Sequence, residues 1–356
     1  MKVGFVLPNT LGNSGGIKVI LEYANEFNKR GYECEVIYPL IPSNYRLYKL
    51  KNIKQFIKFI GTIVLNIFNY NSKKFNEKYK YIKFRKVCKL SNLKSYEYEY
   101  DDLYATAWDT YYYIKDLNVN KKYFVQSYET WAGPEEFVKK TYEDENFKYF
   151  VITKYLKEML HVRHNIISEI VYTPINMISN TKLDKDYSTN IYGVIFRKEK
   201  NKNFDIIIKF LNENKSYRNN FVCLARNLPQ KYKKYFKKVY DGNNSVEKFY
   251  KEINIFIMTS KHEGFSLPIM EAILFENLLI STKTGILNDL HDIKYFELDN
   301  DKEMKDLMVN SLKENIIEIE KINKIEKEKI IKWNKNIFEE YKRKNNWDKN
   351  IEKLNK

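Results

Sequence analysis

Two glutamates that stand eight residues apart, Glu263 and Glu271, are the residues of this sequence whose type and spacing best suit chemistry on a shared ligand. An apolar run at 253–258 predicts a strand that leads into them, and Gly264 allows a tight turn after it. Pro268 is best tolerated in the first turn of a helix, so we expect a helix to begin just before it.

The residues between the two glutamates would then form an anion site. The amides of Phe265, Ser266 and Leu267 would stand at the helix N-terminus, where amides lack intrahelical acceptors and the helix dipole attracts negative charge. Glu263 would lie in the loop before the helix and Glu271 in its first turn. In an alternative interpretation, Glu271 only complements the helix dipole and Glu263 is an acid on a surface loop.

This stretch resembles the signature of the retaining GT-B glycosyltransferases of family 4, also called glycosyl transferases group 1. The shared features are two glutamates separated by seven residues, a Gly-Phe pair after the first and a Leu-Pro pair before the second. In that family the first glutamate touches the donor sugar, the following amides bind the diphosphate of a nucleotide-sugar, and the second glutamate holds the ribose. The resemblance implies these roles for Glu263, for the donor loop at 264–267 and for Glu271.

Two basic residues stand where the same family holds the donor diphosphate. Arg197 follows a strand predicted at 191–196, and Lys202 comes five residues later. An arginine offers a planar fork and a lysine a point charge, and both suit phosphate oxygens. The spacing alone carries little information in a lysine-rich chain, so the resemblance is what implies a catalytic role for Arg197 and Lys202 together with Glu263.

The resemblance also implies a nucleobase site near Gly242. The sequence departs from the family pattern at two positions. The glycines usual before the arginine and before the strand at 278–281 are replaced here by Phe196 and Asn277.

The first half of the chain opens with a strand, a Gly-rich loop and a helix. The spacing of the loop is not that of the G-x-G-x-x-G dinucleotide fingerprint. The resemblance implies that Gly15 and Gly16 let the backbone approach the donor phosphate and the acceptor. In the alternative interpretation, these glycines serve only the turn.

A Gln-x-Tyr-Glu turn at 126–129 resembles a subgroup of the same family that includes some bacterial rhamnosyltransferases. Aromatic rings can cover the apolar face of a sugar while a carboxylate accepts hydrogen bonds from its hydroxyls. We therefore place Tyr128, Glu129 and Trp131 on the acceptor side. An ordinary loop with a buried tyrosine and tryptophan is the alternative.

The composition is that of a soluble globular chain with one strongly basic segment. The 356 residues suffice for two domains, and 44% hydrophobic and 30% charged residues argue against disorder. Residues 44–94 hold fourteen lysines or arginines and one acid, which accounts for +13 of the net charge of +16. Apolar residues between 50 and 68 fall on one helical face, so this segment could lie on an anionic membrane surface or pack against a core.

Other classes of function find little support. The three cysteines are far apart and form no CxxC pair, which argues against a zinc ribbon or a disulfide framework and fits a reducing cytoplasm. No run of about 18 apolar residues predicts a spanning helix, and the N-terminus is typical of a strand. The resemblance implies no metal and no cofactor, although Asp-x-Asp patterns stand at 184–186 and 299–301. No nucleic-acid-binding motif accompanies the basic segment, so no nucleic-acid partner is expected.

Parallel α/β elements must position all of these residues. Strands are expected at 3–7, 34–38, 102–107, 122–125 and 150–153 in the first half, and at 191–196, 221–224, 253–258 and 278–281 in the second. With the resemblance, this pattern predicts a GT-B fold, in which two Rossmann-like domains face each other across a cleft. We expect an acceptor-side domain at 1–173, a nucleotide-sugar domain at 174–330 and a C-terminal helix at 331–356 that packs back on the first domain.

We interpret the sequence as a retaining, metal-independent glycosyltransferase of hexosyltransferase type. It would move a sugar from a nucleotide-sugar to a glycan or lipid-linked acceptor in cell-surface polysaccharide or glycoconjugate biosynthesis. It would be cytoplasmic, and peripheral at the inner face of the membrane if the basic segment binds there. The alternatives are a catalytically degenerate GT-B protein that binds sugar nucleotides, a GT-B epimerase or phosphorylase, and a nucleic-acid-binding protein.

Overall fold

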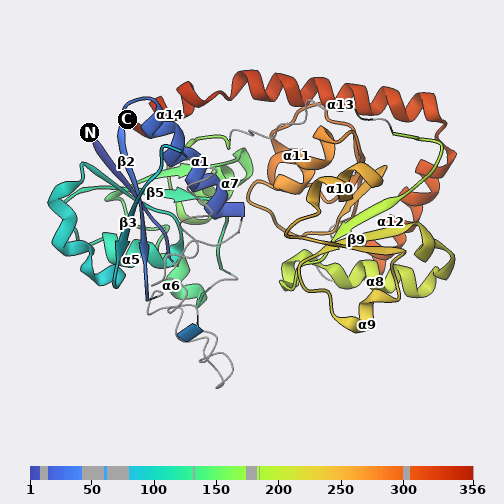
Figure 1. The fold of residues 1–356 in the computed structure, drawn as a ribbon, viewed down its shortest axis with the longest axis horizontal. Coiled ribbons are helices and arrows are strands. Elements are labelled where there is room, and N and C mark those ends of the chain that lie inside the picture. Colours follow the sequence, from blue (N-terminus) through green and yellow to red (C-terminus); the bar gives the residue numbers. More distant parts are fainter. Residues whose placement is uncertain are drawn as a thin grey trace. The chain divides into compact units, whose positions relative to one another are not determined.

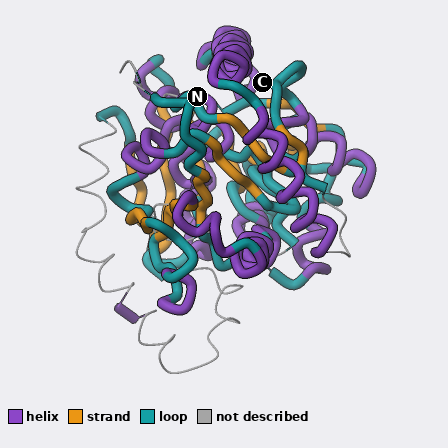
Figure 2. Tube along the Cα trace, turned by 90° about the vertical axis from the view of Figure 1, so that its right-hand side faces the viewer, coloured by secondary structure: helices purple, strands orange, loops and turns teal. Residues whose placement is uncertain are grey.

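The computed structural model describes residues 1–8, 15–41, 60–61, 80–130, 133–173, 183, 185–299 and 305–355. The chain forms two compact units, Met1–Thr173 with Asn346–Lys356, and Pro174–Asn345. Figure 1 follows the chain through both units, and Figure 2 shows the helices, strands and loops along its Cα trace. Most of the basic segment at 44–94, Trp131, and residues 184, 300 and 301 of the Asp-x-Asp patterns lie outside the described residues.

The first unit is built on a seven-stranded parallel sheet with the order β3-β2-β1-β4-β5-β6-β7. Its strands are β1 (Lys2–Val6), β2 (Glu33–Pro39), β3 (Lys83–Val87), β4 (Asp102–Ala105), β5 (Asn120–Val125), β6 (Phe147–Val151) and β7 (Ser168–Ile170). The strand order reverses between β1 and β4, and open α/β sheets bind ligands at the carboxyl ends of the strands at such a point.

The C-terminal segment of the chain belongs to this first unit. The described helices of the unit are α1 (Gly15–Lys29), η1 (Leu90–Glu99), α5 (Trp108–Ile114), α6 (Glu135–Lys140), α7 (Lys154–His164) and the C-terminal α14 (Trp347–Asn355). The ring of Trp347 meets that of Tyr23 in α1, with 5.0 Å between ring centroids. The buried Lys122 Nζ donates to the Leu354 carbonyl oxygen at 2.7 Å and pairs with Asp102 at 2.8 Å. Helix α14 is thus fixed to the first sheet by packing and by a buried charge.

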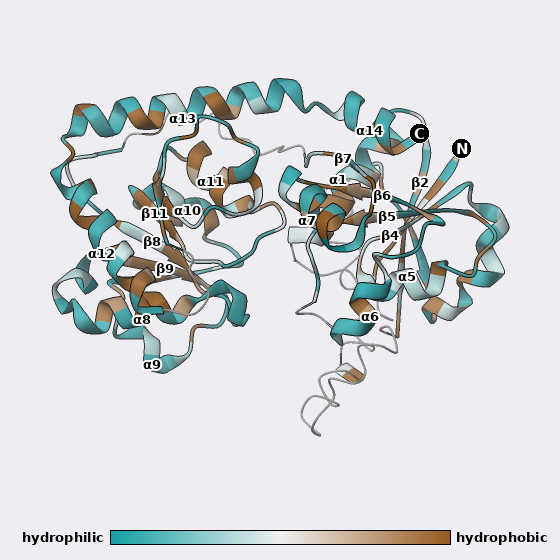
Figure 3. Cartoon of the chain, turned by 180° about the vertical axis from the view of Figure 1, so that it is seen from behind, coloured by the Kyte–Doolittle hydropathy of each residue, from teal (hydrophilic) through white to brown (hydrophobic). Residues whose placement is uncertain are grey.

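The second unit is built on a six-stranded parallel sheet with the order β10-β9-β8-β11-β12-β13. Its strands are β8 (Tyr192–Ile195), β9 (Phe221–Ala225), β10 (Lys238–Asp241), β11 (Ile255–Met258), β12 (Leu278–Ser281) and β13 (Phe296–Glu297). The inner strands are almost wholly apolar, as in Figure 3, because helices cover both faces of the sheet. The strand order reverses between β8 and β11.

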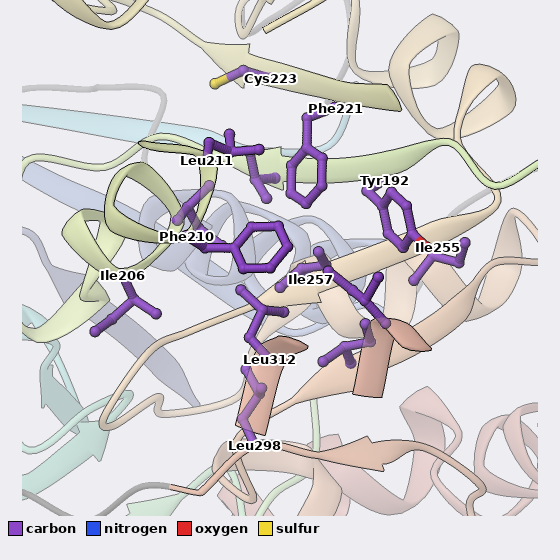
Figure 4. Packing of buried hydrophobic residues seen from close by; sticks show 14 of the residues in the cluster. Tyr192, Ile206, Phe210, Leu211, Phe221, Cys223, Ile255, Ile257, Leu298 and Leu312 are labelled. Atoms are coloured by element: carbon purple, nitrogen blue, oxygen red, sulfur yellow. The ribbon is translucent and has the colours of Figure 1, made fainter. Parts of the chain in front are cut away.

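Helices cover both faces of this second sheet. They are η2 (Lys200–Lys202), α8 (Phe204–Glu213), η3 (Lys215–Asn220), α9 (Gln230–Lys233), α10 (Val246–Glu252), α11 (Leu267–Leu274), η4 (Gly285–Asn288), α12 (Lys305–Lys321) and α13 (Lys324–Lys344). Figure 4 shows the core between the sheet and α8 and α12, where Phe210 and Leu312 pack with Ile257. No helix among the described residues has both the length and the apolar character needed to cross a membrane.

The C-terminal segment divides at a different place from the one expected. The sequence interpretation began the returning helix at 331, whereas α13 stays with the second unit and only 346–356 join the first. The reason lies in the contacts of α13: Ile331 is buried in the second core, and the side chain of Asn334 bonds both backbone groups of Lys294 at 2.8 Å.

Candidate functional site

The residues predicted to bind a donor lie along one edge of the second sheet. Arg197 follows β8, Gly242 follows β10 and Glu263 follows β11. The carboxyl ends of parallel strands meet at the same edge, and β8 and β11 are neighbours at the point where the strand order reverses. The candidate site therefore occupies the position at which open α/β sheets bind ligands.

The centre of the site is an ion pair between Lys202 and Glu263. Lys202 Nζ lies 2.8 Å from both carboxylate oxygens of Glu263, and the two side chains are only 23% and 16% exposed. The Glu263 amide donates to Thr284 Oγ1 at 2.8 Å, while Thr259 Oγ1 donates to the Lys202 carbonyl oxygen at 2.8 Å. These bonds fix both members of the pair to the ends of β11 and β12. Sequence reasoning selected both residues but did not foresee that they pair.

The loop after Glu263 turns into α11 as the sequence predicts, with Pro268 in the first helical turn. The left-handed residue of this loop is Ser266, with a φ of 70°. Among the described residues, no acceptor bonds the amides of Phe265, Ser266 or Leu267. These amides stand at a helix N-terminus, so they remain able to bind an anion.

Gly285 supports this loop from the end of β12. Its φ is +58°, and a Cβ at this position would lie 2.9 Å from the Phe265 carbonyl oxygen. That same oxygen accepts a hydrogen bond from the Ile286 amide at 2.9 Å. Sequence reasoning did not assign Gly285 to the site, although a glycine four residues after the predicted strand end at 281 was an available signal.

Glu271 and Arg197 both influence the pKa of one buried hydroxyl, that of Tyr250. Glu271 is the fifth residue of α11, and the first turn of this helix holds no acid, so the expected place in the first turn is wrong. The pKa of the Tyr250 hydroxyl is raised by burial first, and further by the charge and the hydrogen bond of Glu271, while the charge of Arg197 acts in the opposite direction. Both charged groups therefore lie within electrostatic reach of one hydroxyl.

Gly242 lies at the outer end of the same edge. Its amide donates to the Ala225 carbonyl oxygen at 3.0 Å, and a Cβ at this position would lie 3.1 Å from the Arg226 nitrogen. Asp241 accepts from the Asn243 amide at 3.0 Å, which tightens the turn that follows. A side chain here would meet the neighbouring strand end in tight contact, and that backbone would have to give by a few tenths of an ångström.

In the first unit, Gly15 and Gly16 open α1 after a loop that lies outside the described residues. A Cβ at Gly16 would lie 3.2 Å from Gln126 Oε1, so this glycine admits the side chain of the Gln-x-Tyr-Glu turn. The structure thus gives Gly16 a packing role beside the turn, at the carboxyl ends of the strands of the first sheet.

Tyr128 and Glu129 are both engaged inside the first unit. Glu129 Oε2 accepts from the Trp108 amide at 2.7 Å, which caps the N-terminus of α5. The Tyr128 hydroxyl lies 3.0 Å from His164 Nε2, and its ring stacks on Tyr142 with 5.4 Å between centroids. Burial lowers the pKa of His164. The turn is therefore a fixed part of this unit.

Comparisons with known proteins bear on the fold. No protein-family model and no curated protein sequence matches the chain. Sucrose-phosphate synthase from Thermosynechococcus elongatus superposes with a TM-score of 0.66 at 9% identity, covering 99% of this chain and 97% of that one. Anabaena HepE in complex with UDP-glucose gives 0.66 at 12% identity, covering 100% and 99%. A TarM variant from S. aureus in complex with fondaparinux, alpha-GlcNAc-glycerol and UDP gives 0.67 at 13%, covering 99% of each chain. The predicted GT-B fold, with two parallel-sheet α/β domains, is confirmed.

Proposed function

We propose that this chain is a glycosyltransferase that moves a sugar from a nucleotide-sugar donor to a glycan or lipid-linked acceptor with retention of anomeric configuration. The observation that carries the proposal is the Lys202–Glu263 pair beside the amides at the start of α11, which no acceptor in the described part of the chain bonds, all at the reversal point of the second sheet. The likeness in fold to HepE, solved with UDP-glucose, and to TarM, solved with UDP, supports it.

The proposed chemistry follows from charge. Departure of a nucleoside diphosphate builds negative charge, which Arg197, Lys202 and the amides before Pro268 would stabilise without reorganisation. Lys202 Nζ has three hydrogens and contacts two oxygens of Glu263, which leaves at least one hydrogen for a phosphate oxygen. Glu263 would orient the sugar and stabilise positive charge at its anomeric carbon. The leaving phosphate would take the acceptor proton, so the proposal needs no side-chain base and no metal.

We propose that the acceptor binds to the first unit. Tyr128 and Glu129 lie in the turn after β5, and we propose that this turn borders the acceptor sugar. We place the reaction in cell-surface polysaccharide or glycoconjugate biosynthesis, in the cytoplasm, with the basic segment at 44–94 holding the enzyme at the inner face of the membrane.

The test is binding and turnover of sugar nucleotides. Wild type and the Arg197→Ala, Lys202→Met and Glu263→Ala variants are heated with UDP-, GDP-, dTDP- and ADP-sugars, with Lys200→Met as the control for an exposed lysine in the same turn. A donor at 100 times its Kd stabilises a protein by about 2.7 kcal/mol. We expect one nucleotide class to stabilise wild type and the control but not the site variants. No stabilisation by any donor refutes the proposal.

Product analysis separates the remaining candidates. Release of free sugar from the bound donor indicates a transferase that uses water in place of its acceptor. Binding without any turnover indicates a degenerate protein, and a changed sugar still attached to the nucleotide indicates an epimerase.

A further inference from the structure

Ser266 stands in the candidate donor loop, and the proposed mechanism uses its amide but not its side chain. It directly precedes α11 and has left-handed backbone angles, with a φ of 70° and a ψ of 65°. A residue with a Cβ populates this conformation about fivefold to thirtyfold less than the right-handed one. The loop therefore needs contacts that hold Ser266 in this conformation.

The hydroxyl of Ser266 does not cap the helix. A serine at this place usually accepts from the amide of the second or third helical residue. Here the second residue is Pro268, which has no amide hydrogen, and the Ile269 amide donates to the Ser266 carbonyl oxygen at 3.1 Å. The side chain is therefore free to turn away from the amides at the start of α11.

The hydroxyl turns into the second unit and donates to Met258 Sδ at 3.0 Å. Ser266 and Met258 are only 5% and 6% exposed, so solvent does not readily replace either partner. Met258 is the last residue of β11, where it pairs in register with Ser281 and accepts from the Thr282 amide at 3.3 Å. The contact thus ties the loop to a fixed position in the sheet.

The two peptide groups that flank Ser266 are each held by one further bond. The Phe265 carbonyl oxygen accepts from the Ile286 amide at 2.9 Å, and the Ser266 carbonyl oxygen accepts from Ile269. These same peptide groups carry the amides of Ser266 and Leu267. The left-handed angles of Ser266 therefore set the direction of one amide relative to the other, and a left-handed residue among successive amides is a feature of anion-binding concavities.

We propose that Ser266 and Met258 are positioning residues, whose hydroxyl–thioether contact holds the left-handed turn that aims the amides of Ser266 and Leu267 at the donor diphosphate. The inference rests on the proposed function, because it takes these amides as the diphosphate site. It goes further by assigning the geometry of that site to two buried side-chain groups that do not touch the donor.

The experiment measures Kd by calorimetry for UDP, GDP and ADP, for their nucleosides, and for pyrophosphate. The proteins are wild type, Ser266→Ala, Ser266→Gly, Met258→Leu, the double variant of the last two, and Met270→Leu. The last is a matched control, because Met270 is a buried methionine of α11 and leucine changes its volume little. Urea unfolding of each protein shows that it is folded.

Alanine and glycine at position 266 separate a held turn from simple packing. Glycine removes more atoms than alanine, so a packing role predicts that Ser266→Gly binds no better than Ser266→Ala. Glycine also adopts left-handed angles without support, so a held turn predicts the opposite order. We expect Ser266→Ala and Met258→Leu each to weaken diphosphate binding by about fivefold to thirtyfold, and Ser266→Gly to bind about fivefold or more tighter than Ser266→Ala.

Two further comparisons restrict the effect to this contact. In the Ser266→Gly background, Met258→Leu is expected to have no further effect, since coupled residues are non-additive. The losses are expected for the nucleoside diphosphates and pyrophosphate but not for the nucleosides, which lack the group that the amides bind. Every affinity of Met270→Leu is expected to stay within about twofold of wild type, below the effect of one hydrogen bond.

Three results would overturn the inference while the proposed function stands. Ser266→Ala could bind diphosphates as tightly as wild type. Ser266→Gly could bind no better than Ser266→Ala, which would mean a packing role. Met258→Leu could leave binding unchanged, or weaken it equally in the Ser266→Gly background. If wild type binds no nucleotide and no pyrophosphate, the proposed function itself fails and this inference fails with it.

Discussion

Replacing Lys202 with methionine is expected to separate stability from catalysis at this site. The change keeps the aliphatic chain but removes the ammonium group that lies 2.8 Å from both oxygens of Glu263. The Glu263 side chain is only 16% exposed, so its carboxylate would lose its counter-charge in a largely desolvated place. We expect the free energy of unfolding to fall by about 1–3 kcal/mol, the cost of a buried polar group that loses its partner.

The effect on turnover has a different origin and a different remedy. Loss of one preorganised group that stabilises transition-state charge lowers kcat by about 10²–10³, or about 2.7–4 kcal/mol. The double variant Lys202→Met with Glu263→Gln removes the stranded charge, so it is expected to recover most of the lost stability. It cannot recover activity, because the cation for the leaving diphosphate is still missing.

Urea unfolding and donor turnover, measured on the same preparations, test this reasoning. Lys200→Met is the matched control, since Lys200 is an exposed lysine of the same short turn and should change neither quantity. If Lys202→Met is as stable as wild type, the pair contributes nothing to the fold. If the double variant regains turnover, the assignment of Lys202 to the diphosphate is wrong.

Three further perturbations have defined outcomes. Lys185→Met is expected to lower the free energy of unfolding by about 1–3 kcal/mol, since three oxygen acceptors within 2.8 Å lose their donor. Burial lowers the pKa of Lys185 to about 7 from its usual 10.5. Between these two pH values the unfolded chain binds more protons than the folded chain, so the stability of wild type should rise with pH there. Urea unfolding of wild type and of the variant across this pH range measures the difference. Lys122→Met is expected to cost about 3–5 kcal/mol in urea unfolding, because it strands the buried Asp102, and Asp102→Asn in the same chain should restore most of it. Gly285→Ala is expected to weaken nucleoside diphosphate binding in calorimetry by about tenfold or more, since its Cβ would displace the Phe265 carbonyl.

Each of these has a result that contradicts it. A Lys185→Met variant whose stability depends on pH in the same way as wild type would mean that another group titrates. Full stability of Lys122→Met would mean that the buried pair is dispensable for docking α14. Unchanged nucleotide affinity in Gly285→Ala would mean that the turn at Gly285 does not support the donor loop.

The strands that sequence reasoning found and those that it missed differ in their place in the sheets. It found the interior strands, and it missed β3, β7, β10 and β13, which are the four edge strands. An interior strand of a parallel sheet is buried on both faces and is therefore apolar throughout. An edge strand carries charges that discourage pairing with other chains, as Lys83, Arg85 and Lys86 do in β3, and its sequence loses the apolar run.

Site residues that stand close together in the sequence could be predicted from their spacing. Contacts between residues that only the fold brings together could not. Glu263 and Glu271 share one loop and helix, so their pattern is visible in the sequence. Lys202 and Glu263 are 61 residues apart, and only the adjacency of β8 and β11 brings them together. Gly285 was missed for the same reason, since it contacts the loop from the connection after β12.

The missing glycine before β12 shows how the chain compensates for a departure from a pattern. The sequence analysis placed the missing glycine of the family pattern at Asn277. In the structure the left-handed residue is Glu276, with a φ of 56°, so Glu276 occupies the position that favours glycine. A non-glycine residue there costs of order 1–3 kcal/mol unless its surroundings hold it. Here the Glu276 carbonyl accepts from the Tyr187 hydroxyl at 3.0 Å, and the next side chain, the buried Asn277, accepts from Lys185 Nζ at 2.6 Å. Lys185 also bonds the carbonyl of Tyr250, and the Tyr250 hydroxyl donates to the Pro268 carbonyl oxygen in the first turn of α11 at 3.2 Å. The turn that departs from the pattern and the candidate donor site are therefore parts of one hydrogen-bonded structure.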